Sequence, residues 1–195
     1  MSQDYTLAAL LESGRFSLHR GIKHMIYCDK KLLTYEEQKN YLAAIAYLEK
    51  QYSMKNSFDI LLALFADSWC YFNMPDICQS ASMEIYGKWK QYTDIIITKQ
   101  FDDFARYVVG YVLCLHGFYF GAKYEQTGRE ILSECAKQSS DECIKKLAES
   151  FIANEKKNAA KKYPSYDLSD CLKLFPSESL LDRYFRRIIM MSGSE

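Results

Sequence analysis

The chain has 195 residues, of which 49% are hydrophobic and 26% are charged, as is usual for a globular protein. It carries 25 basic and 25 acidic side chains, and this zero net charge argues against a protein whose main task is to bind phosphate backbones. Only three prolines and eight glycines occur, which argues against a turn-rich β-sandwich. We therefore expect one soluble domain without a nucleic-acid partner.

The seven cysteines show neither CxxC spacing nor histidines at the spacing of a zinc site. An odd number of cysteines in apolar helical patterns indicates free thiols in a reducing compartment, so we expect a cytoplasmic protein without disulfides. The N-terminus lacks the basic and apolar segments of a signal peptide. The longest uncharged run, 107–122, is shorter than the roughly 20 residues that a membrane-spanning helix needs, so we expect no membrane span.

Helical periodicity runs through the whole chain and predicts about nine helices, the first two over residues 4–12 and 17–28. Thr34 and Glu37 have the spacing of a capping box, which predicts that the next helix begins at Thr34 and includes Tyr52. The only candidate strand, 95–97, has no second strand to pair with.

A helix predicted from Asn56 or Ser57 to the Asn73-Met74-Pro75 stretch is apolar on nearly all sides, so it should be central. Its core is expected to include Phe65 and Trp69. Pro75 then fits the first turn of a helix that ends near residue 92.

The longest and most apolar helix is predicted over residues 98–121 and should be buried, with Leu113 and Leu115 in the core. Further helices are expected over 127–137, 141–161, 168–174 and 177–191, followed by a disordered tail at 192–195. The sequence thus predicts an all-α fold. We expect one domain over residues 1–191, built as a bundle or as stacked helical hairpins.

Two charged features leave alternatives open. Asp67 lies among apolar residues, which predicts either a position at a solvent edge or in an ion pair, or the acidic lip of a binding cleft. The basic amphipathic stretch 180–189 either covers the protein's own core or binds a membrane or partner groove.

The sequence contains no recognisable catalytic or metal-binding motif. His19 and His24 lack the i, i+4 spacing of a helical metal pair, and no nucleophile–base pair or phosphate loop can be assembled from the local sequence. We therefore expect no catalytic, cofactor-binding or metal-binding residues, no cofactor and no enzymatic activity.

One alternative comes from a resemblance in outline. A histidine in an N-terminal helix, a long helix with Gly110, Gly117 and Gly121, and a length near 200 residues resemble the haem-oxygenase class of all-helical proteins. This resemblance implies a helical-bundle enzyme or cofactor carrier with a pocket near His116. The residues around the three glycines depart from the pattern of that family.

The favoured hypothesis is a stoichiometric protein-binding module, because the chain has 16 Tyr, 11 Phe and 2 Trp and such rings suit interfaces. Tyr86, Trp89 and Tyr92 alternate with lysines and are candidate anchors, unless core packing takes all three rings. Acidic side chains that could face a basic cleft are Glu36, Glu37, Asp102 and Asp103. The expected partner is one protein, such as a toxin or effector blocked by an immunity- or antitoxin-type inhibitor; homo-oligomerisation stays open.

Overall fold

The computed structural model describes residues 26–156 and 167–192. Within these ranges every regular element is helical, so the predicted all-α fold is confirmed. The elements in chain order are α2 (Lys30–Glu37), α3 (Tyr41–Lys55), α4 (Phe58–Phe72), α5 (Gln79–Ile96), α6 (Asp103–His116), the 3-10 helix η1 (Gly117–Phe120), α7 (Ala122–Gln138), α8 (Glu142–Lys156), the 3-10 helix η3 (Ser169–Leu174) and α9 (Leu180–Ser192).

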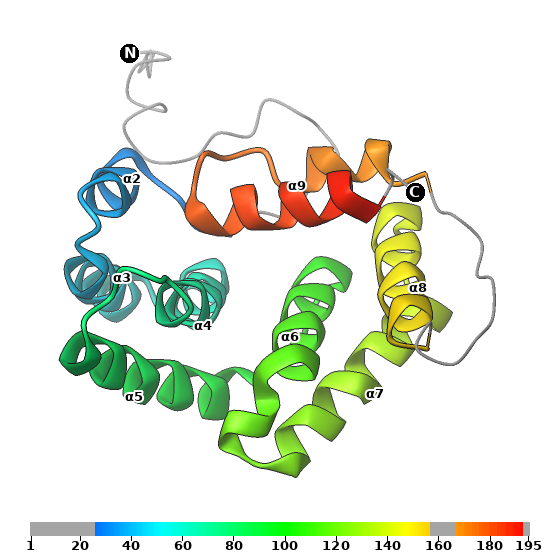
Figure 1. Cartoon of the computed structure of the whole chain (residues 1–195), viewed down its shortest axis with the longest axis horizontal. Coiled ribbons are helices and arrows are strands. Elements are labelled where there is room, and N and C mark those ends of the chain that lie inside the picture. The colour runs from blue at the N-terminus through cyan, green and yellow to red at the C-terminus, as the bar shows by residue number, and fades with distance from the viewer. Residues whose placement is uncertain (1–25, 157–166, 193–195) are drawn as a thin grey trace, which may run out of the picture.

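Helices α4 and α6 form the centre of the molecule. Figure 1 shows α2, α3 and α5 on one side of them, α7 and α8 on the other, and α9 across the top. Every residue of α4 from 60 to 71 is buried, which confirms its predicted central position. Phe65, Trp69 and Leu113 are buried as predicted, whereas Leu115 is only half-buried because it lies near the end of α6.

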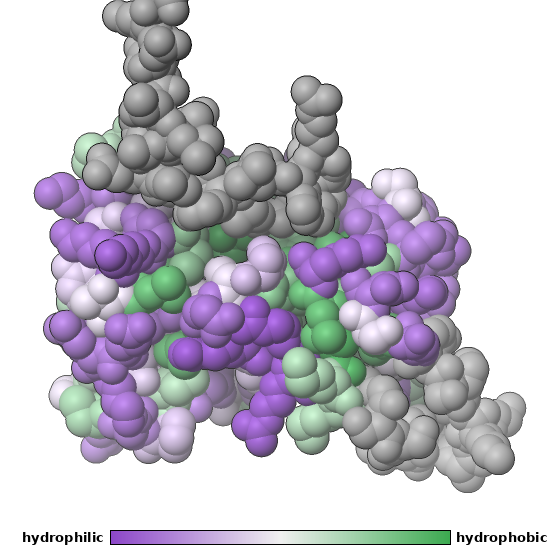
Figure 2. Space-filling view, turned by 90° about the horizontal axis from the view of Figure 1, so that it is seen from above, coloured by the Kyte–Doolittle hydropathy of each residue, from purple (hydrophilic) through white to green (hydrophobic). Residues whose placement is uncertain are grey.

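Helix α9 covers the protein's own core. Leu181, Phe185 and Ile189 are buried, and the Phe185 ring stacks on Phe175 with 4.6 Å between centroids. The neighbouring Tyr184 ring meets Trp69 of α4 edge-on at 5.0 Å. Figure 2 shows the face seen from the α9 side, where hydrophobic residues form patches between hydrophilic ones. Core coverage is thus the alternative that the structure supports for the 180–189 stretch.

The predicted capping box is wrong. The side chain of Asp29 accepts a hydrogen bond from the Leu32 amide at 2.9 Å, so α2 begins four residues before Thr34. The Thr34 hydroxyl lies inside α2 and donates to the Lys30 carbonyl instead. Asn40 then begins α3, since its side chain accepts from the Ala43 amide. Asp29 and Asn40 therefore cap two separate helices where the sequence predicted one helix that begins at Thr34.

Other helix ends also move, while the helices themselves remain. Pro75 precedes α5, which begins after Cys78, and the candidate strand 95–97 lies at the end of this helix. The long helix begins only after Asp102, whose side chain accepts from the Ala105 amide at 2.8 Å. It ends at His116 rather than Gly121, and η1 follows.

Several predictions fall outside the described residues: the helix over 4–12, most of that over 17–28, His19, His24, the end of that over 141–161 and nearly all of the tail. Among the helices described, none combines the length and apolar character needed to cross a membrane. All seven cysteines have free thiols.

Candidate functional site

The three candidate anchor rings lie on α5 at different depths. Trp89 is 0% exposed and Tyr92 is 4% exposed, and the Tyr92 hydroxyl donates to Glu49 Oε1 at 2.6 Å. Only Tyr86 is half-buried and reaches the surface. The prediction that Trp89 and Tyr92 are exposed anchors is therefore wrong. Both rings pack in the core, which is the alternative that the sequence analysis left open.

The four candidate acids do not form one exposed surface. Glu36 is buried and accepts hydrogen bonds from the Tyr71 hydroxyl at 2.7 Å and the Leu180 amide at 2.9 Å. Asp103 accepts from the Ser140 amide and so ties α6 to the loop after α7. Glu37 and Asp102 are exposed, but they lie on separate elements, at the ends of α2 and α6. The prediction that Glu36 could face a partner's basic cleft is therefore wrong, because this side chain is buried and connects α2 to α4 and α9.

An exposed aromatic surface lies beside Tyr86, on the turn that joins α6 to α7. The Phe118 and Tyr119 rings of η1 stack with 4.4 Å between centroids and 28° between planes. They remain 52% and 45% exposed, respectively. Met83, 64% exposed, precedes Tyr86 by one turn on the same side of α5. We call these four residues, Met83, Tyr86, Phe118 and Tyr119, the η1 surface.

Core residues hold the η1 surface in place from below. The Tyr86 hydroxyl donates to the Tyr119 carbonyl at 3.1 Å, and the Tyr119 ring meets Phe72 edge-on at 5.5 Å. The next residue, Phe120, packs its ring 4.4 Å from buried Trp89. The buried part of the predicted aromatic cluster thus supports exposed rings that the sequence analysis did not single out.

Two glycines shape the turn that carries these rings. A Cβ atom at Gly117 would lie 2.7 Å from the Glu125 amide nitrogen, so only glycine allows α7 to approach this closely. Gly121 has φ +116°, a conformation that side-chain-bearing residues rarely adopt. These glycines end α6 and reverse the chain. The two glycines were visible in the sequence, but the sequence analysis placed both inside one longer helix.

The structure does not favour a cofactor pocket at His116. This half-buried ring accepts a hydrogen bond at Nδ1 from Trp69 Nε1 at 2.6 Å, and burial lowers the pKa of His116. In the neutral ring the proton then lies on Nε2, so neither nitrogen offers a free lone pair to a metal. The glycine side of α6 is also occupied, because a Cβ at Gly110 would lie 2.9 Å from the Ile131 side chain of α7.

Asp67 fits neither of its predicted positions. It is 1% exposed, and neither carboxylate oxygen has a hydrogen-bond partner in the part of the chain that the structure describes. It is therefore not an acidic lip, and among the described residues it is not a member of a buried ion pair. In the same part of the chain, no three His, Cys, Asp or Glu side chains gather in a way that could hold a metal ion.

No protein-family model matches the chain, and neither the curated proteins nor the solved structures contain a significant match to it.

Proposed function

We propose that this protein is a stoichiometric protein-binding module that contacts its partner through the η1 surface. The observation that carries the proposal is the stacked, half-exposed Phe118–Tyr119 pair. Aromatic side chains have few rotatable bonds, so they bury a large area at a low cost in conformational entropy. They are also enriched among the residues that dominate binding energy.

The support beneath the pair strengthens this proposal. The Tyr86–Tyr119 hydrogen bond and the Phe120–Trp89 contact hold the turn on α5 before any partner arrives. Lys90 adds to this support, since its ammonium group lies 5.7 Å from the centroid of the Phe120 ring and pairs with Asp94 at 2.5 Å. A preorganised surface loses less entropy on binding than a flexible one.

The finer form of the proposal is an inhibitor that occludes a toxin or enzyme in the cytoplasm, as immunity and antitoxin proteins do. Rigid anchors suit such a task, because a preformed surface can fill a partner's cleft without first becoming ordered. The protein would then act by occupancy at a ratio of one to one, without turnover of its own.

The test begins with a partner isolated from the native cell on the wild-type protein. Its affinity is then measured by calorimetry for wild type, Phe118→Ala, Tyr119→Ala and the control Met54→Ala, which removes a side chain 68% exposed on α3. We expect each ring variant to lose at least about tenfold in affinity, about 1.4 kcal/mol, and the control to bind normally. Circular dichroism checks that each variant is folded.

Two outcomes would contradict the proposal. Wild-type affinity in both ring variants would remove the η1 surface as the contact site. Turnover of a small molecule by the purified protein would contradict action by binding alone. For the finer form, an enzymatic partner should lose its activity at one equivalent of wild-type protein, and Phe118→Ala should require more.

A further inference from the structure

Three carboxyl groups are buried where α2, α4 and α9 meet. Glu36 is 4% exposed, Asp67 is 1% exposed and Asp182 is 5% exposed. They come from three different helices that are distant in the sequence. Burial of this many acids at one junction is unusual, because a carboxylate is rarely removed from water without a cation or several hydrogen-bond donors.

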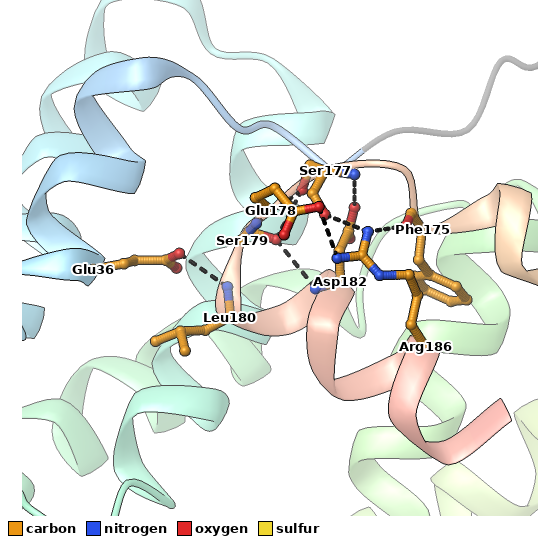
Figure 3. Close-up of polar contacts among 8 residues, drawn as sticks. All are labelled: Glu36, Phe175, Ser177, Glu178, Ser179, Leu180, Asp182 and Arg186. Carbon is orange, nitrogen blue, oxygen red and sulfur yellow. Dashed lines mark hydrogen bonds and ion pairs between the residues drawn. The ribbon is translucent and has the colours of Figure 1, made fainter. Parts of the chain in front are cut away.

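Two of the three carboxyls hold the start of α9. Figure 3 shows Glu36 reaching from α2 to the amide of Leu180, the first residue of α9, at 2.9 Å. Asp182 accepts from the Ser177 amide at 2.7 Å, and its own amide donates to Ser179 Oγ at 3.1 Å. Acceptors at this position complement the free amides of a helix N-terminus.

Asp67 has no such partners, because neither of its carboxylate oxygens has a hydrogen-bond partner in the described part of the chain. The Ser68 hydroxyl beside it is also buried and lacks a hydrogen-bond partner in the described part of the chain. The charged groups that act on Asp67 are Glu36 from α2 and Asp182 from α9, and both oppose its ionisation. Helices α3, α5 and α6 also pack on α4. Within the described ranges, none of their charged groups is among the causes that raise the pKa of Asp67.

The nearby bases serve other groups. Arg186 donates to the carbonyls of Phe175 and Ser177, at 2.9 and 2.6 Å, and pairs with Glu178 at 3.1 Å (Figure 3). Arg183 is exposed, and its charge acts on Glu36. In the described part of the chain, the thiols of Cys28 and Cys70 and the hydroxyl of Tyr71 are further titratable groups near Asp67, and burial raises the pKa of each of these three groups.

An ionised Asp67 would be an unpaired charge in the core beside two further acids, an arrangement that is strongly unfavourable. We infer that Asp67 is protonated in the folded protein, and that its ionisation loosens the junction of α2, α4 and α9. A neutral carboxyl group avoids both the cost of a buried charge and the repulsion from Glu36 and Asp182. We expect α9 to loosen first, because Glu36 accepts a hydrogen bond from its first residue and Asp182 accepts one from the loop before it.

The electrostatics agree with this geometry. Burial, and then the charges of Glu36 and Asp182, raise the pKa of Asp67 well above its usual value. Burial also raises the pKa of Glu36 and of Asp182. A carboxyl group whose pKa is raised by folding stabilises the protein fully below its unfolded pKa, about 3.9 for Asp. This stabilisation is lost as the pH rises towards and through the pKa of the folded state.

The test compares urea unfolding of wild type and Asp67→Asn from pH 5 to pH 9. The amide has the shape of the neutral carboxyl but cannot ionise, so the variant should lose less stability as the pH rises. We expect the ratio of the two folding constants to change at least about tenfold over this range, since one unit of pKa shift corresponds to tenfold. Asp170→Asn, which removes an exposed acid of η3, is the control and should follow wild type.

Hydrogen exchange then locates the effect. With exchange corrected for its intrinsic pH dependence, α9 should lose protection in wild type at high pH, more than α7 does and more than α9 of Asp67→Asn. Identical pH profiles of stability in wild type and Asp67→Asn would overturn the inference. If Asp67→Asn does not fold, the infrared spectrum of wild type at neutral pH decides: a protonated-carboxyl band is expected, and its absence would overturn the inference.

Discussion

At the scale of single residues, the cysteines differ sharply in their surroundings. Cys78 is exposed at the start of α5, where the Ser80 hydroxyl and the Ala81 amide lower the pKa of its thiol. Burial instead raises the pKa of Cys28, Cys114 and Cys135 to about 12. Because the thiolate is the reactive form, position and chemistry both make Cys78 the more reactive thiol.

We therefore predict that iodoacetamide at neutral pH alkylates Cys78 well before half-buried Cys28 and the buried Cys114 and Cys135. Peptide mass spectrometry over a time course measures the order, and Cys78→Ser should remove the fast phase. Labelling of Cys114 or Cys135 in the folded protein at the rate of Cys78 would contradict the described burial.

The core makes a second prediction at this scale. Phe65 is 0% exposed and Trp69 is 1% exposed on the central helix. Replacement of either by Ala should lower the free energy of unfolding by about 3–5 kcal/mol, because the surrounding helices cannot close the cavity. Trp69→Ala also removes the donor to His116 Nδ1. Denaturant unfolding measures both variants, and losses below about 1 kcal/mol in both would show that α4 is not central.

At the scale of elements, two glycines inside helices have opposite surroundings, so their replacement by Ala gives a matched comparison. A Cβ at Gly128 of α7 would lie 2.3 Å from the Cys114 amide nitrogen of α6, whereas a Cβ at Gly87 of α5 would meet nothing within 4 Å. Gly128→Ala should therefore destabilise the protein by about 1–3 kcal/mol through overpacking. Gly87→Ala should stabilise it by up to about 1 kcal/mol, since Ala favours helix more than Gly does. Equal melting temperatures for the two variants would show that α6 and α7 are not in such close contact.

Elements that a repeating apolar pattern specifies could be predicted from the sequence, and their ends often could not. The pattern of α4 from Phe58 to Phe72 predicted both a helix and its burial. At Thr34, by contrast, a local pattern competed with Asp29 and Asn40, and only the three-dimensional path of the chain shows which side chain caps a helix. Cap residues are common in sequences, so a capping pattern alone does not fix a boundary.

The candidate site was harder to predict, because exposure depends on neighbours that are distant in the sequence. Trp89 and Tyr86 are three residues apart on one helix, yet Trp89 is buried beneath η1 while Tyr86 reaches the surface. Phe118 and Tyr119 belong to an apolar run that predicted burial, and the turn at Gly117 and Gly121 exposes them. The surroundings of Asp67 likewise depend on how α2 and α9 pack beside α4, which a sequence pattern does not show.

At the scale of the whole molecule, the proposed binding surface and the proposed pH-sensitive junction of α2, α4 and α9 lie in different places. The η1 surface is formed by the turn between α6 and α7 together with α5, and the buried carboxyls lie where α2 and α4 meet α9, at the top of Figure 1. The two proposals can therefore fail separately. Loss of binding in Phe118→Ala leaves the carboxyl junction intact, and Asp67→Asn leaves η1 intact.

The central claim is that a partner contacts the η1 surface, and the most direct measurement is hydrogen–deuterium exchange of the protein with and without its isolated partner. We predict that binding protects the amides of residues 117–121 and of the first half of α5, while α8 exchanges as in the free protein. Tyr119→Ala should weaken this protection at the same partner concentration. Protection confined to α8 or α9, with residues 117–121 unchanged, would contradict the account.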